Sequence, residues 1–260
     1  MTGIRISGIS VTPIKGFSLS HPSSISLTSS GAQGDREFFL IDDQDSVLSI
    51  TRTGKFASFV PDYDPATNEL VITAPDGSGV RAEIALGQPI EANFWGHHKA
   101  PAREVNGPWA RWFSDIEGRH VRLVKALAPN GGHDLEPVTM LGNATVGSLE
   151  EHAGLQNLDS RRFRMLLTFS GGTPYMEDSW VNKELTIGSA SIIVNGLVKR
   201  CAAVTRDPET GERNLTLLRM MKQQKGLRES VLGTGVCLGV YARVSTPGII
   251  RVGDGINVSG

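Results

Sequence analysis

The sequence predicts a mainly β protein that contains a β-barrel. Three observations support this fold class: short segments alternate apolar and polar residues, 30 glycines punctuate the chain, and long stretches with helical periodicity are scarce. Closed barrels suit short strands separated by turns, because closure removes exposed strand edges. We therefore expect a barrel over residues 125–260, a smaller β-rich subdomain over residues 1–124 and a few short helices.

Strands are predicted at intervals along the whole chain. The first covers residues 4–12, and residues 36–52 predict two strands around an Asp-rich turn. Residues 69–84, "ELVITAPDGSGVRAEI", predict a hairpin that turns at "PDGSG". The remaining expected strands lie within residues 184–201, 236–244 and 249–258.

Three helices are predicted from start and stop signals. The first runs from Asn106, its expected cap, to Gly118. The second starts at the expected cap Thr145 and stops at Gly154, and the third stops at Gly226. A Thr-capped helix start presents free backbone N–H groups that bind phosphate well. An ordinary capped surface helix remains the alternative for the second helix.

Composition and charge narrow the class of protein. The formal net charge is −1, so no overall attraction to nucleic acid or anionic lipid is expected. The first residues lack the apolar stretch of a signal peptide, and no apolar run approaches the ~20 residues of a membrane span. These features predict a soluble, cytoplasmic protein without a nucleic-acid or membrane partner.

The two cysteines differ in their sequence surroundings. Cys237 lies in "GVCLGVYARV", which predicts a buried core strand, and a cysteine there acts as a small hydrophobe. Cys201 follows Lys199 and Arg200, and neighbouring cations stabilise the thiolate, which attacks electrophiles or binds soft metals. If the strand continues to Cys201, Lys199 shares its face and Arg200 points away. Burial as an inert thiol is the alternative for Cys201 as well.

Basic residues occur at strand ends and turns, where binding sites usually lie. Lys15 follows the first strand, Arg36 precedes "EFFLID", and Arg164 lies in "RRFRMLL". Each alone is compatible with an ordinary surface charge, whereas together they would form an anion site. The pair His97-His98 lacks an acidic or thiol partner at a useful spacing and is assigned to a surface loop.

Several of these motifs together carry a family resemblance. The run "GLVKRCAAVTRDPETGERN" resembles the signature of the MOSC family, the molybdenum-cofactor sulfurase C-terminal domains, in which an Arg-Cys pair precedes a Thr and an Asp-Pro-Glu-Thr-Gly turn. "VTPIKG", "GDREFFLID", "GHDLEPVTMLGNATVGSLEEH" and "GVYARVSTPGIIRVGDGINV" resemble further family elements in the same order. The resemblance covers nearly the whole chain and implies a MOSC-type β-barrel that follows an N-terminal MOSC β-region.

The resemblance also implies a site for the molybdenum cofactor, a pyranopterin. In family members that bind this cofactor, the cysteine that matches Cys201 holds the metal, so Cys201 is the expected metal ligand and catalytic residue. A soft thiolate is a suitable ligand for molybdenum. The family's cofactor contacts fall here on Lys15, Arg36, Asn143, Thr145, Arg164, Lys199 and Tyr241.

Two classes of function follow from the resemblance. The first is a molybdenum-dependent oxidoreductase that reduces small N-hydroxylated or N-oxide substrates. Its electrons would come from a separate donor protein, because two cysteines cannot hold an iron–sulfur cluster. The second is sulfur transfer through a persulfide on Cys201. A metal-free lyase or binding protein is a third possibility, and pyridoxal phosphate binding is a further family-level expectation.

Overall fold

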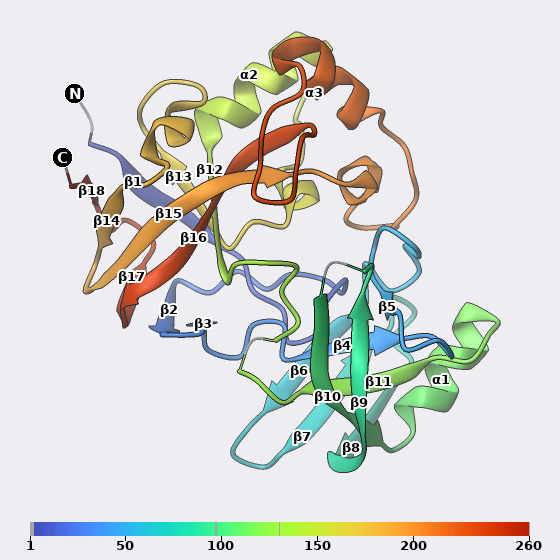
Figure 1. Cartoon of the computed structure of the whole chain (residues 1–260). Coiled ribbons are helices and arrows are strands. Elements are labelled where there is room, and N and C mark those ends of the chain that lie inside the picture. Colours follow the sequence, from blue (N-terminus) through green and yellow to red (C-terminus); the bar gives the residue numbers. More distant parts are fainter. Residues whose placement is uncertain (1–2, 97, 130, 260) are drawn as a thin grey trace.

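The structure is a computed structural model of the 260-residue chain, and it describes residues 3–96, 98–129 and 131–259. The predicted fold class is confirmed, because strands dominate over three short α-helices in this described part. Figure 1 shows the strands in two groups, with helices α2 and α3 beside one group and helix α1 beside the other.

The larger group is a seven-stranded, barrel-like sheet. Its strands follow one another in the order β1 (Arg5–Ile9), β13 (Leu167–Ser170), β12 (Val138–Gly142), β16 (Cys237–Thr246), β15 (Ala190–Lys199), β14 (Glu184–Ile187) and β18 (Ile256–Val258). The two ends of this order also meet, since Ile6 N donates to Asp254 O at 2.9 Å and Ile256 N donates to Ile4 O at 3.0 Å. The sheet is therefore nearly closed.

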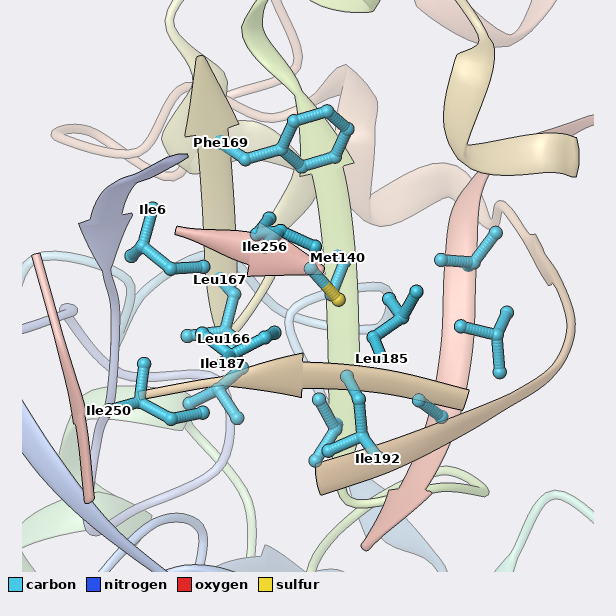
Figure 2. Packing of buried hydrophobic residues seen from close by; sticks show 14 of the residues in the cluster. Ile6, Met140, Leu166, Leu167, Phe169, Leu185, Ile187, Ile192, Ile250 and Ile256 are labelled. Carbon is cyan, nitrogen blue, oxygen red and sulfur yellow. The ribbon is translucent and has the colours of Figure 1, made fainter. Parts of the chain in front are cut away.

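Apolar side chains from these strands fill the inside of the sheet. Figure 2 shows Ile6, Met140, Leu167, Leu185 and Ile256 converging from separate strands. Leu167 is 0% exposed. This burial of branched and aromatic side chains drives closure of the sheet, because each one removes apolar surface from water.

A three-stranded sheet beside the barrel joins the two ends of the chain. It contains β17 (Gly248–Arg251), β2 (Ser24–Thr28) and β3 (Gly31–Ala32). Strand β1 likewise pairs antiparallel with β13. Strands from the first 32 residues thus pair with the C-terminal part of the chain, and the predicted domain division at residue 124 stays a prediction.

The smaller group consists of two further sheets. The five-stranded sheet has the order β5 (Val47–Leu48), β4 (Phe38–Ile41), β11 (Arg122–Ala126), β10 (His98–Asn106) and β9 (Ala85–Phe94). The three-stranded sheet has the order β6 (Val60–Asp64), β7 (Glu69–Thr73) and β8 (Gly79–Glu83). Their shared core is rich in aromatic rings, with Phe17 stacked on Phe56 at 5.6 Å between ring centroids and edge-on to Phe113 at 5.6 Å.

The long hairpin β9–β10 has no counterpart among the predicted strands. Its strands pair from Ala85 with Asn106 to Phe94 with His98. The hairpin carries Pro89 and Pro101 and several exposed charged residues, so its sequence lacks a regular apolar alternation. His98, assigned to a surface loop, begins β10 and its ring stacks on Phe94; His97 lies outside the described residues.

The three predicted helices are present as α1 (Trp109–Glu117), α2 (Asn143–Ala153) and α3 (Leu217–Lys225). All three stop at the predicted glycines, and Gly118 and Gly154 adopt the left-handed conformation of a helix end. Short 3₁₀ turns occupy Ser160–Phe163, Met176–Trp180 and Ala202–Thr205.

The two predicted helix caps are wrong. Asn106 ends strand β10, and α1 is preceded by Pro108 without a side-chain cap. Helix α2 is preceded by Gly142, which puts Thr145 inside its first turn. The Thr145 hydroxyl donates to Glu177 Oε2 at 3.0 Å and accepts from Tyr175 N at 2.8 Å, so tertiary partners use the oxygen that a cap would need.

Removal of a central barrel side chain should test the role of the apolar core. We expect Leu167→Ala to lower the free energy of unfolding by about 2–5 kcal/mol, because it leaves a cavity among buried neighbours. Leu86→Ala is the matched control: Leu86 is 43% exposed, and its loss should cost less than about 0.5 kcal/mol. Urea titrations followed by circular dichroism measure both values, and equal costs would contradict this account of the core.

Candidate functional site

A cavity of about 560 Å³ lies between the two groups of strands. Lys15, Arg36 and Thr51 from the N-terminal part line it together with Arg164 and Cys201 from the C-terminal part. This volume is in the range of small-molecule and cofactor sites. Residues that are far apart in the sequence therefore share one concave site.

The lining of this cavity is strongly cationic. Among its described lining residues are two carboxylates, Asp134 and Glu136, against seven basic side chains: Lys15, Arg36, Arg52, Arg162, Arg164, Lys199 and Arg200. Some cations are paired, as Arg52 is with Asp42 at 2.9 Å and Arg162 with Asp207 at 3.2 Å.

Arg164, Lys199 and Arg200 form no ion pair with any residue that the structure describes. Their partners are carbonyl oxygens and a thioether. Arg164 Nη2 donates to Phe17 O at 2.6 Å, and Lys199 Nζ donates to Leu232 O at 3.0 Å. The described lining of the cavity therefore carries positive charge that no carboxylate neutralises.

Lys15 is held deep in the wall of the cavity. Its ammonium donates to Gly132 O and contacts Asp134 Oδ1, both at 2.7 Å. Burial lowers the pKa of Lys15, and Asp134 opposes this change, while Arg36 and Arg164 add to it. Lys15 is only 7% exposed, so an anion bound beside it would recover electrostatic energy that water does not supply.

Arg36 and Arg164 lie against each other across the boundary between the two parts of the chain. Both have left-handed backbones, with φ of 53° and 52°, a conformation that is costly for residues with a Cβ. Arg36 Nη2 donates to Arg164 O at 3.0 Å, and its Nη1 pairs with Asp35. Burial and the neighbouring charge of Arg36 lower the pKa of Arg164.

His133 is a neutral histidine beside this pair. Burial, followed by the charges of Arg36 and Lys15, lowers its pKa well below the ordinary value. Its Nε2 lies 3.5 Å from Asp35 Oδ2, yet it has no hydrogen-bond partner among the described residues. Its side chain is 10% exposed, and this nitrogen itself is buried.

Cys201 is exposed and lines the cavity, and its role as a reactive thiol stays a prediction. Strand β15 ends at Lys199, so the expected alternation does not extend to Cys201. The prediction that Arg200 points away is therefore wrong: Arg200 lines the cavity. Burial lowers the pKa of Arg200, whereas Cys201 and Tyr241 act in the opposite direction.

Cys237 is buried, as the sequence predicts. It is 4% exposed in the barrel core, and burial raises the pKa of its thiol. Both cysteines are free.

The structure brings together six of the eight predicted site residues: Lys15, Arg36, Arg164, Lys199, Cys201 and Tyr241. Burial raises the pKa of Tyr241, which keeps its hydroxyl protonated. Asn143 and Thr145 do not line the cavity. The Asn143 amide donates to Ser7 Oγ at 3.1 Å, and Thr145 bonds to Glu177.

Sequence reasoning missed several residues of the cavity wall. His133 and Asp134 come from the Pro- and Gly-rich segment 128–137, and Thr51 comes from a turn that follows β5. Trp95 lines the cavity from the tip of hairpin β9–β10 with a left-handed backbone. A bulky residue at such a turn, where Asn or Gly is usual, is the one local signal that points to Trp95.

The fold and the site define a β-barrel protein with a cationic cavity and one exposed thiol. Family models match both parts of the chain: the MOSC N-terminal beta barrel domain matches residues 3–120, and the MOSC domain matches residues 128–257. The chain belongs to the MOSC domain family.

Curated relatives of this chain are longer proteins. Mitochondrial amidoxime-reducing component 1 of Homo sapiens is 29% identical over 131 residues, which are 49% of this chain and 38% of that protein. Molybdenum cofactor sulfurase of Oryza sativa subsp. japonica is 23% identical over 249 residues, which are 82% of this chain and 29% of that protein. The matched regions thus span well under half of these relatives.

Among solved structures, the YUAD protein of Bacillus subtilis is similar with a TM-score of 0.49 at 10% identity. The similarity covers 99% of this chain and 96% of that chain. In the described residues, no helix has both the length and the apolar character needed to cross a membrane.

The two thiols should differ in reactivity. We expect iodoacetamide to alkylate Cys201 at least about tenfold faster than Cys237 in the folded, ligand-free protein, because Cys201 is exposed and Cys237 is buried in the core. Mass spectrometry of peptides resolves the two rates, and Cys201→Ser isolates the slow thiol. Equal rates would contradict the assignment of Cys201 as the accessible thiol.

Proposed function

We propose that the cavity binds the molybdenum cofactor, with Cys201 as the protein ligand of the metal. The observation that carries this proposal is the convergence of one exposed thiol and three cations without anionic partners in a single cavity. A pyranopterin phosphate supplies the missing negative charge, and a soft thiolate is a suitable ligand for molybdenum.

The residues present fit such a cofactor. Lys15, Arg36 and Arg164 offer charged donors to a phosphate, and charge-assisted hydrogen bonds of this kind are the strong ones. The unpartnered Nε2 of His133 and Nε of Arg200 are buried groups that a polar ring system would satisfy. The same cations would also bind the phosphate of pyridoxal phosphate. Chemical identification of the released ligand distinguishes the two cofactors.

We further propose that the protein reduces N-hydroxylated compounds, as the name of the amidoxime-reducing relative suggests for that protein. When bound, the cofactor supplies a metal that accepts an oxygen atom. The reaction breaks the N–O bond, consumes two electrons and two protons, and releases water with the N–H product. A separate donor protein would supply the electrons.

In this reaction the side chains of the cavity would bind and orient the cofactor, and they would donate protons. The cationic wall would hold the cofactor, and the sulfur of Cys201 would hold its metal. The protonated Tyr241 hydroxyl is a hydrogen-bond donor in the same wall. The His133 ring, beside Arg36 and Lys15, would be a second group for proton exchange once a bound anion offsets their charge.

Sulfur transfer is the second candidate function. The exposed position of Cys201 would also suit a persulfide, and the rice relative is a molybdenum cofactor sulfurase. A persulfide on Cys201 adds the mass of one sulfur atom, which mass spectrometry of the untreated protein detects. Such an adduct on protein without molybdenum would favour this candidate.

Cofactor content tests the main proposal. We expect protein from a cofactor-producing host to contain molybdenum and a pterin, measured by metal analysis and by fluorescence of the oxidised, released pterin. Cys201→Ser should lower the molybdenum content at least about tenfold, because it removes a metal ligand. Its melting temperature should stay close to that of the wild type, since the volume change is small.

Cys237→Ser is the matched control for this experiment. It removes the other thiol, so we expect the molybdenum content to persist while stability falls, because a hydroxyl replaces a thiol in the barrel core. Absence of molybdenum and pterin from the wild-type protein, or full molybdenum content in Cys201→Ser, would overturn the proposal.

A further inference from the structure

A turn from the N-terminal part of the chain reaches the sulfur of Cys201. The Thr51 hydroxyl oxygen lies 3.2 Å from Cys201 Sγ. The two residues are 150 positions apart in the sequence, and both line the cavity. A hydroxyl at this distance is within hydrogen-bonding range of sulfur, so the thiol has a polar partner that sequence inspection does not indicate.

Hydrogen bonds to its backbone hold Thr51 in place. Arg213 Nη2 donates to Thr51 O at 3.2 Å, and Arg206 Nη2 approaches the same oxygen at 3.5 Å. On the other side of the residue, Thr51 N donates to Ser49 Oγ at 3.3 Å. Two arginines from the C-terminal part therefore fix a turn from the N-terminal part beside Cys201.

A pair of glycines makes this approach possible. A Cβ on Gly54 would collide with the carbonyl oxygen of Gly211, and a Cβ on Gly211 would collide with that of Gly54. Gly211 also has a φ of +73°, which glycine adopts without strain. Backbone contacts backbone at this point, so any side chain at either position would push the two turns apart.

The turn that carries Gly211 is held by its own hydrogen bonds. Asp207 Oδ1 accepts the backbone N–H groups of Glu209 at 2.9 Å and of Thr210 at 3.1 Å. Gly211 N donates to Asp207 O at 2.8 Å, and Arg206 Nη1 donates to Gly211 O at 2.7 Å. The Asp-Pro-Glu-Thr-Gly turn is thus held by hydrogen bonds, and it packs against the segment that contains Thr51.

We propose that Thr51 is a positioning residue for the sulfur of Cys201 and that the turn from Asp207 to Gly211 serves to hold it there. A thiolate has no hydrogen to donate, so in that form the Thr51 hydroxyl is the donor of this pair. The hydrogen bond fixes the direction in which the sulfur points in the cavity. Thr51 then sets how well the sulfur attacks or binds a soft partner.

This inference rests on the proposed function only in taking Cys201 as the reacting sulfur. It holds for a metal ligand and for a persulfide carrier alike. Alkylation of the ligand-free protein needs no cofactor. A protein without molybdenum that still shows a Thr51 effect would reject the proposed function and keep this inference.

The test compares two substitutions at Thr51 at one fixed pH. Thr51→Val keeps the shape of the side chain and removes the hydroxyl, whereas Thr51→Ser keeps the hydroxyl. We expect iodoacetamide to alkylate Cys201 about fivefold more slowly in Thr51→Val, as for the loss of one hydrogen bond. Thr51→Ser should stay within about twofold of the wild type.

Thr53→Val is the matched control in the same turn. The Thr53 hydroxyl donates to Glu117 Oε2 at 2.9 Å, and among the described residues the hydroxyl that bonds to Cys201 is that of Thr51. This variant should lose stability but keep the wild-type alkylation rate. Arg213 is exposed and donates to the Thr51 carbonyl. Arg213→Met removes this donor, so it should slow alkylation without unfolding the protein.

The outcomes separate the roles of Thr51. An unchanged rate in Thr51→Val would overturn the proposal. Equal slowing in Thr51→Val, Thr51→Ser and Thr53→Val would overturn it as well, because the turn would then act through its fold alone. Slowing confined to Thr51→Val and Arg213→Met, with recovery in Thr51→Ser, supports the proposal.

Discussion

The crowding of positive charge in one cavity is the constraint on which the rest of the structure depends. Buried cations are costly unless carboxylates or carbonyl oxygens satisfy them. Here Asp35 pairs with Arg36 and Asp134 with Lys15, while Arg164 donates to the carbonyl of Phe17. These bonds hold the cations without neutralising all of them, so the described lining of the cavity keeps an excess of positive charge.

The same constraint explains why both parts of the chain are needed. Lys15 and Arg36 come from the N-terminal part, whereas Arg164 and Cys201 come from the C-terminal part. Hydrogen bonds such as Arg36 to the Arg164 carbonyl cross the boundary, and so does the contact between Thr51 and Cys201. The cavity is thus a product of the assembly of two β-structures, and neither one contains it alone.

Much of the fold could be predicted from local sequence patterns. Hairpin β7–β8 shows its turn in "PDGSG", and the three helices stop at glycines, because turn and helix-end chemistry depends on adjacent residues. The hairpin β9–β10 was not predicted, because its prolines and exposed charges interrupt the alternation of apolar and polar residues. The caps at Asn106 and Thr145 failed because a strand partner and Glu177 use those residues instead.

The sequence by itself determined the mainly β fold, the core role of Cys237 and, through family motifs, six residues that line the cavity. Only the tertiary structure decided that Arg200 faces the cavity and that Thr51 touches Cys201. The first depends on where strand β15 ends, and the second on a contact across 150 positions. Periodicity records which side of an element is buried, but long-range packing decides which side chains then meet.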